Sequence, residues 1–161
     1  TAILALPYPI DGLMSFNFWQ EDFYWVSHKD ECPSQQVEIS SSELDLDKLM
    51  LLKDGHCLKE HALAACSLQN KRQSSEFDSA SLYTLIQMVA GKLGTTLVPQ
   101  MALDQLINVQ SELQAIHLNE LGPHRTLALI SRPNYVRTNE LLSLKKLFNQ
   151  QLSVNCLSQN P

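Results

Sequence analysis

Short apolar runs, separated by polar or turn-forming residues, recur along the chain. Runs of this kind that are rich in β-branched and aromatic side chains are typical of strands. The predicted strands are 2–6, 16–19, 23–26, 49–52, 95–99, 113–118 and 125–131. The polar segment 30–42 contains Pro33 and predicts a loop.

Apolar residues at helical spacing predict three helices between these strands. The defining positions are Leu58, Ala62, Ala65 and Cys66 in the first helix; Leu82, Leu85, Ile86, Val89 and Leu93 in the second; and Leu141, Leu144, Phe148 and Leu152 in the third. Ser79 or Ser81 is the candidate N-cap of the second helix, and Gly91 or Gly94 lies near its end. Strands that alternate with helices predict an α/β fold.

The composition is that of a globular protein. The chain has 161 residues, of which 44% are hydrophobic and 18% are charged, enough for one domain or two small subdomains. Its apolar runs are too short for a membrane-spanning helix, and no basic segment precedes a long apolar one as in a secretory signal. The chain begins at Thr1 inside an apolar run, so we expect it to be a fragment of a longer protein.

Charge and motifs exclude two further classes of function for this segment. The net charge is −5, and no dense cluster of lysine or arginine is present to hold a phosphate backbone. Any DNA-binding part is therefore expected upstream of Thr1. No G-x-G-x-x-G sequence occurs, so the nucleotide-binding fingerprint is absent.

Four cysteines are present, Cys32, Cys57, Cys66 and Cys156. No Cys-x-x-Cys spacing occurs, so the sequence does not predict a structural zinc site or a thioredoxin-like motif. Cysteines in a chain without a signal peptide predict a reducing, cytoplasmic compartment. A disulfide in such a protein would be transient and regulatory.

Cys57 follows an Asp-Gly turn and His56, where the first predicted helix begins. Partial positive charge at a helix N-terminus and a neighbouring cationic side chain both favour a thiolate, the form that attacks a peroxide bond. The alternative is that Cys57 is a small buried hydrophobic residue, as most unbridged cysteines are. A metal site at Cys57 and His61 would need a third ligand, and none lies near in sequence.

Cys66 lies nine residues after Cys57 within the same predicted helix. Nine residues of α-helix rise by about 13 Å, whereas a disulfide requires Cα atoms within about 7 Å. The two thiols can therefore form a disulfide only if the helix breaks, which would give a two-state segment. The alternative is that Cys66 packs in the core and never meets Cys57.

The stretch DGHCLKEHALAAC, residues 54–66, closely resembles the redox loop of the peroxide-sensing members of the LysR-type transcriptional regulators. The family pattern is DGHCLRDQA followed by a second cysteine at the same interval. The resemblance also covers ILALP, SLYTLIQMVAGKLGTTLVP and HRTLALISRP, and so runs through almost the whole chain. Three positions depart from the pattern: Lys59, Glu60 and His61 replace Arg, Asp and Gln.

The resemblance implies specific roles for four residues. Cys57 matches the peroxide-reacting cysteine and Cys66 the resolving cysteine. His56 matches the histidine beside the reactive thiol, and Arg125 matches an arginine that stabilises the thiolate. Cys32 and Cys156 have no counterpart in the pattern. No cofactor or metal is implied.

The resemblance also implies a fold and an assembly. The family's regulatory domain is periplasmic-binding-protein-like, with two α/β subdomains joined by crossover strands. Residues 1–22 and 128–161 would belong to an incomplete subdomain I, and residues 23–127 would form subdomain II with the redox cysteines. Residues 82–93 match the helix at the dimer interface, so we expect a homodimer or homotetramer.

We therefore expect the regulatory domain of a transcriptional activator of the oxidative-stress response, switched by hydrogen peroxide through a reversible Cys57–Cys66 disulfide. Such a protein is not an enzyme. It would reach promoter DNA and RNA polymerase only through its full-length form, and would have no contact with a membrane. The alternatives are a LysR-type regulator that binds a small effector between its subdomains, and a thiol peroxidase.

Overall fold

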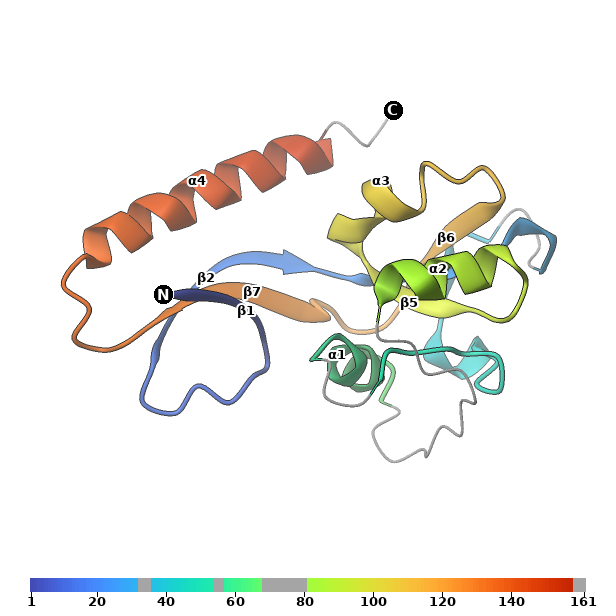
Figure 1. The fold of residues 1–161 in the computed structure, drawn as a ribbon, viewed down its shortest axis with the longest axis horizontal. Helices are drawn as coiled ribbons and strands as arrows, with labels where there is room; N and C mark the ends of the chain where they lie inside the picture. The colour runs from blue at the N-terminus through green and yellow to red at the C-terminus, as the bar shows by residue number, and fades with distance from the viewer. Residues whose placement is uncertain (32–35, 54–56, 68–80, 158–161) are drawn as a thin grey trace. The chain divides into compact units, whose positions relative to one another are not determined.

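The structure, a computed structural model, describes residues 1–31, 36–53, 57–67 and 81–157, with side chains up to residue 153 (Figure 1). Its internal contacts divide the chain into two compact units. Unit 1 comprises residues 1–20 and 125–161, and unit 2 comprises residues 21–124. The division into regulatory subdomains at residues 22 and 128 stays a prediction. Among the described residues, no helix combines the length and apolar character that crossing a bilayer requires.

Unit 1 is built on a sheet of β1 (Ala2–Leu6), β7 (Arg125–Ser131) and β2 (Met14–Glu21), with β7 in the centre. β1 and β7 are antiparallel. The helix α4 (Thr138–Leu157) packs Phe148 against Phe18 of β2, with ring centroids 5.2 Å apart. The amide of Asn149 also donates a hydrogen bond to the Phe18 carbonyl (3.0 Å). These contacts fasten α4 to the sheet.

Unit 2 contains a second sheet, in the order β4 (Glu38–Ile39), β6 (Leu113–Leu118), β3 (Phe23–His28) and β5 (Thr96–Pro99). β3 is antiparallel to both of its neighbours, and β4 is parallel to β6.

Side chains alternate across a strand, so β3 contributes to both faces of the sheet. Phe23 and Trp25 pack in one apolar cluster, and Val26 packs in another.

One helix covers each of these faces. The helix α1 (Cys57–Ala65) contributes Ala62 to the cluster of Phe23 and Trp25. The helix α2 (Leu82–Ala90) contributes Leu85, Ile86 and Val89 to the cluster of Val26. Figure 1 shows α1 and α2 in unit 2, with α2 beside β5. The sheet does not fully separate the two helices, because Leu58 of α1 also packs against the cluster that contains Val26 and the buried residues of α2.

Most predicted elements are present. Strands 2–6, 113–118 and 125–131 occur with the predicted bounds, and α1 begins at Cys57 as expected. The second helix ends at Ala90, with Ser81 as its N-cap and Gly91 as its C-cap.

Segment 49–52 was predicted as a strand, and this is wrong. Its residues are buried, but Leu49 pairs with Thr95 only through an isolated bridge and not within a strand. The bridge is closed by hydrogen bonds from Met50 N to Thr95 O and from Thr95 N to Lys48 O, both 2.8 Å. A side chain at Gly94 would collide with the Lys48 carbonyl oxygen, so this close approach requires glycine.

Several short elements were not predicted. They are η1 (Lys29–Glu31), β4, η2 (Ser41–Glu43), η3 (Gln100–Ala102) and α3 (Leu103–Leu106). The predicted stripe of the last helix is also wrong at Leu144, whose side chain is 40% exposed, although Leu141 is buried.

Candidate redox site

Cys57 is the first residue of α1, and its side chain is exposed. The residues that follow include Leu58 and the alanines at 62, 64 and 65, all strong helix formers, which explains why a helix begins here. The first turn of a helix has unpaired N–H groups and partial positive charge, so it favours negatively charged groups. Because the Cys57 side chain is exposed, the alternative that it is a buried hydrophobic residue is wrong.

Cys66 lies in the opposite environment. It directly follows α1, its N–H donates to the Ala62 carbonyl (3.2 Å), and its side chain is only 2% exposed. It packs in the same apolar cluster as Phe23, Trp25 and Ala62. This burial, and secondarily the negative charge of Glu120, raises the pKa of the Cys66 thiol to about 12. Cys66 is consequently a neutral thiol at physiological pH.

A contact within unit 2 keeps the Glu120 carboxylate ionised. Hydrogen bonds from Ser41 lower the pKa of Glu120, first through the Ser41 side chain and second through its backbone N–H, which donates to a Glu120 carboxylate oxygen (2.7 Å). Glu120 therefore stays ionised, which disfavours a second negative charge on Cys66. No pattern in the sequence indicates this effect of Glu120 on Cys66, because the two residues lie far apart in the chain.

Cys57 and Cys66 are not joined by a disulfide. The nine-residue helix α1 stands between them, with a rise of about 13 Å against the 7 Å or so that a disulfide allows. Burial also keeps Cys66 from becoming the thiolate that attacks another sulfur. Unwinding of α1 would be needed to remove both obstacles, because only an unwound chain can fold back to bring the two Cα atoms within reach and let Cys66 leave its apolar cluster.

The contacts that hold α1 in place are modest. Within the helix only His61 and Ala62 are buried, whereas α2 buries Leu85, Ile86 and Val89. Burial of an alanine removes much less apolar surface from water than burial of a leucine, isoleucine or valine. A cavity of about 10 Å³, lined by Leu58 and Ala62 of α1 among others, lies against α2. Release of α1 would thus disrupt less apolar packing than release of α2.

Cys57 and Cys66 lie at the two ends of one helix. The other predicted site residues, Arg125 and His56, are not seen to join them. Arg125 is the first residue of β7, is partly buried, and belongs to unit 1. His56 and Cys32 lie outside the described residues, as does the side chain of Cys156. The roles of His56 and Arg125 stay predictions.

A metal site at Cys57 and His61 finds no support. His61 is 1% exposed, whereas Cys57 is exposed. Over the described part of the chain, no three His, Cys, Asp or Glu side chains are placed to hold a metal ion.

Two histidines that gave no functional signal in the sequence have structural contacts. His124 is buried, and its Nδ1 accepts a hydrogen bond from the Phe23 N–H (2.9 Å). The His124 N–H donates to Asp22 (3.3 Å), which also contacts His117 Nε2 (3.1 Å). These contacts fasten the start of β3 to the segment that follows β6.

Comparisons with known proteins agree with this fold. A profile of the LysR substrate binding domain matches residues 1–153. The HTH-type transcriptional regulator EstR of Acinetobacter baylyi is 38% identical over 81% of this chain and 43% of its own length. The hydrogen peroxide-inducible genes activator of Dickeya chrysanthemi is 30% identical over 82% of this chain and 43% of its own length. The chain thus spans less than half the length of these two relatives.

A solved structure is similar over most of the chain. The reduced form of the regulatory domain of OxyR2 from Vibrio vulnificus aligns with a TM-score of 0.80 and 36% identity. The alignment covers 92% of this chain and 70% of that structure. The predicted periplasmic-binding-protein-like α/β fold is confirmed by this similarity together with the family profile.

Proposed function

Because this chain belongs to the LysR substrate binding domain family, we propose that it is the redox-sensing regulatory domain of an OxyR-like transcriptional regulator. The observation that carries the proposal is an exposed thiol at the start of α1 and a buried thiol at its end. The relative named as a hydrogen peroxide-inducible genes activator supports peroxide as the signal.

The proposed chemistry has two steps. The Cys57 thiolate attacks one oxygen of hydrogen peroxide, which breaks the O–O bond, gives a sulfenic acid and releases hydroxide. The Cys66 thiol then attacks the Cys57 sulfur, so that an S–S bond forms and water leaves. Two electrons pass from the two thiols to one peroxide. A cellular thiol reductant would reverse the switch.

Two further residues are proposed to tune the first step. A cationic or hydrogen-bond-donating side chain near a thiol favours the thiolate, and the family resemblance gives this role to His56 and Arg125. Neither residue enters the second step, in which the reacting atoms are the two sulfurs.

The proposal for the whole protein extends beyond this chain. The longer relative named as a transcriptional regulator supports a DNA-binding part outside it, through which promoter DNA and RNA polymerase would be contacted in the cytoplasm. The protein would assemble as a homodimer or homotetramer, with α2 at an interface. It would act as a switch and not as an enzyme.

A second candidate function rests on a specific observation. EstR has a higher identity to this chain than the peroxide-named relative, 38% against 30%. EstR is named as a transcriptional regulator and not as a peroxide-inducible activator, which keeps open the alternative of a LysR-type regulator that binds a small effector between its subdomains and in which the two cysteines are incidental. A thiol peroxidase is a third reading, and sustained peroxide turnover with a thiol reductant would identify it.

Trapping of the sulfenic acid separates these functions. The Cys66→Ser variant, treated with equimolar peroxide and a sulfenic-acid probe, should carry the probe on Cys57, and the Cys57/Cys66 double serine variant should carry none there. An unlabelled Cys57 in the single variant would exclude peroxide sensing at this residue and favour the effector-binding alternative.

A further inference from the structure

The strand β2 of unit 1 has a free edge. β7 pairs with one side of β2, and no strand of the described residues pairs with its other side. β2 has eight residues, more than the roughly five or six of a typical strand, and its sequence MSFNFWQE contains neither lysine nor proline. Those two residue types commonly protect an edge strand from pairing with another chain. The edge of β2 is therefore open to one further strand.

A pocket with a volume of about 420 Å³ runs along this edge. It is lined by four consecutive residues of β2, 17–20, and by Lys145 and Asn149 of α4. Successive side chains of a strand point to opposite faces of the sheet, so a pocket that contacts all four residues lies at the edge and not on one face. Lys145 and Asn149 are four residues apart and so lie on the same side of α4, which forms the other wall.

The side chain of Asn149 indicates which backbone groups of β2 face the pocket. Its amide donates a hydrogen bond to the Phe18 carbonyl (3.0 Å), as the N–H of a neighbouring strand would. The N–H and C=O of one strand residue point to the same side, and this side alternates along the strand. The N–H groups of Phe18 and Gln20 therefore point toward the free edge, where a further strand would accept from them.

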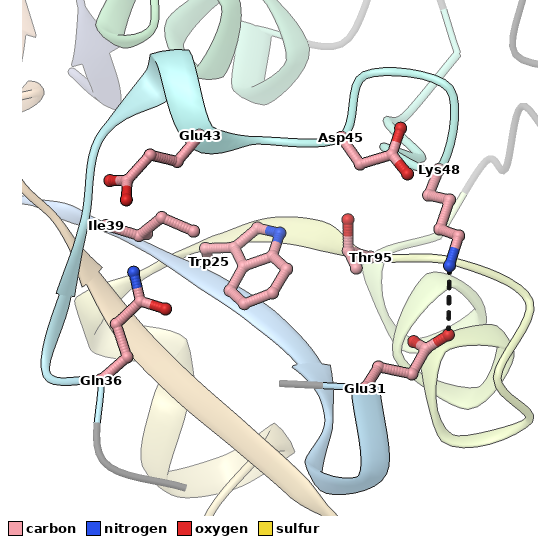
Figure 2. A pocket seen from close by; sticks show the side chains of 8 residues that line it. All are labelled: Trp25, Glu31, Gln36, Ile39, Glu43, Asp45, Lys48 and Thr95. Carbon is pink, nitrogen blue, oxygen red and sulfur yellow. Dashed lines mark ion pairs between the residues drawn. The ribbon is translucent and has the colours of Figure 1, made fainter. Parts of the chain in front are cut away.

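The charge of this pocket is opposite to that of the pocket around Trp25 in unit 2. The unit 2 pocket is lined by three carboxylates, and the ammonium of Lys48 there is paired with Glu31 (Figure 2). By contrast, the described residues that line the unit 1 pocket include no carboxylate. Lys145 is half-buried there, and no carboxylate of the described residues pairs with its ammonium. This pocket therefore favours a ligand that brings its own carboxylate.

We propose that the edge of β2 binds an acidic, extended segment of a partner protein. The segment adds a strand to the sheet of unit 1 and places a glutamate or aspartate at Lys145. In this mode of recognition, backbone hydrogen bonds supply affinity and side-chain pockets supply specificity. A small anion would satisfy Lys145 but leave the strand edge unpaired. The surface needs no cysteine and lies wholly in unit 1, so the proposal goes beyond the redox switch.

Proton–nitrogen spectra of the full chain provide the test, with the backbone N–H groups of Phe18 and Gln20 and the indole of Trp19 as reporters. The probe is the peptide acetyl-Thr-Val-Glu-Val-Thr-amide, titrated to about 5 mM because short segments bind weakly. The matched control has lysine in place of glutamate. Two further peptides are N-methylated, one at both valines and the other at glutamate and the last threonine. Each methylated peptide lacks the N–H donors of one of its two edges.

We expect saturable shifts of the reporters with the glutamate peptide, and slower hydrogen exchange of the Phe18 and Gln20 N–H groups. The lysine peptide, and one of the two methylated peptides, should each bind at least about tenfold more weakly. Lys145→Glu should reverse the preference between the glutamate and lysine peptides. Lys146→Gln, which changes an exposed neighbouring lysine outside the pocket, should leave the preference unchanged.

Unmoved reporters with the glutamate peptide would overturn the proposal. Equal affinity for the glutamate and lysine peptides would do the same, as would full affinity for both methylated peptides. Reporters that move when the chain alone is diluted would assign the edge to a second copy of the chain. Peptide binding to this chain but not to the full-length protein would assign the edge to another segment of the same protein. Either of these last two results would also overturn the proposal.

Discussion

Cys57 is exposed at the first residue of α1, whereas Cys66 is buried directly after the last residue of the same helix. One helix therefore keeps two thiols apart and in opposite environments. Peroxide can reach the first thiol without any change of fold. The second can react only after α1 opens, because distance and burial both prevent it. In the proposed mechanism, Cys57 therefore carries out the chemical step, and α1 undergoes the conformational step.

A weaker α1 should speed the conformational step alone. Ala64 is a partly exposed residue in the last turn of α1, and glycine there should destabilise the helix by up to about 1 kcal/mol. We expect Ala64→Gly to form the disulfide about fivefold faster after oxidation of Cys57, with the peroxide step unchanged. Stopped-flow mixing followed by acid quench and mass analysis measures both steps.

The matched control is Gln87→Gly, which weakens α2 at an exposed position without touching α1. It should leave both rates as they are. Equal disulfide rates in Ala64→Gly and the unsubstituted chain would contradict the requirement that α1 opens.

The burial of Cys66 predicts a loss of stability at alkaline pH. The pKa of this thiol is raised from 9.0 to about 12 in the folded chain, so folding favours the neutral form. The stabilisation is complete below about pH 9 and is lost as the pH rises toward 12. Urea unfolding under reducing conditions should show roughly 2 kcal/mol more loss between pH 9 and 10.5 in the unsubstituted chain than in Cys66→Ala. Parallel pH profiles would show that Cys66 is accessible to water.

Arg125 and His56 are tested by the rate of the first step. If the guanidinium of Arg125 favours the Cys57 thiolate, Arg125→Gln should slow peroxide oxidation of Cys57 by about tenfold at neutral pH. Arg125→Lys keeps the charge, so its rate of Cys57 oxidation should lie between the rates of Arg125→Gln and the unsubstituted chain. His56→Gln should slow the reaction in the same direction. Unchanged rates in Arg125→Gln and His56→Gln would leave the start of α1 as the sole activator.

The outer face of α2 is predicted to contribute to self-association. The apolar periodicity of this helix is largely explained by its buried residues Leu85, Ile86 and Val89, so an interface would have to use its other residues. Tyr83 is 60% exposed and Met88 is partly buried on the same helix. Tyr83→Asp and Met88→Asp should each weaken association of the full-length protein by at least about tenfold, measured by sedimentation. Tyr83→Phe, the matched control, should associate as strongly as the unsubstituted protein. If neither aspartate variant weakens association, the interface lies elsewhere.

Strong periodicity made much of this fold predictable. The strands 113–118 and 125–131, and the helices that begin at Cys57 and Leu82, have apolar patterns long enough to define both type and position. The short elements β4 and α3 lack such a pattern, because two or four residues do not establish a period. Segment 49–52 has the apolar character of a strand, but it makes isolated bridges, such as that of Leu49 with Thr95, and no continuous ladder.

The candidate site was predictable only in part. The cysteine spacing and the start of the helix are local features, so both could be predicted from the sequence. The burial of Cys66 depends on side chains from distant segments, such as Phe23 and Trp25, and on the charge of Glu120.

Disulfide mapping after peroxide treatment tests the central claim most directly. The reduced full chain is treated with equimolar hydrogen peroxide, alkylated, digested and analysed by mass spectrometry, with amide hydrogen exchange of residues 57–66 recorded in parallel. The account predicts a Cys57–Cys66 bond as the principal product, together with faster exchange across α1. A reduced Cys57 beside oxidised Cys32 or Cys156, or a Cys57–Cys66 bond with unchanged protection of α1, would contradict it.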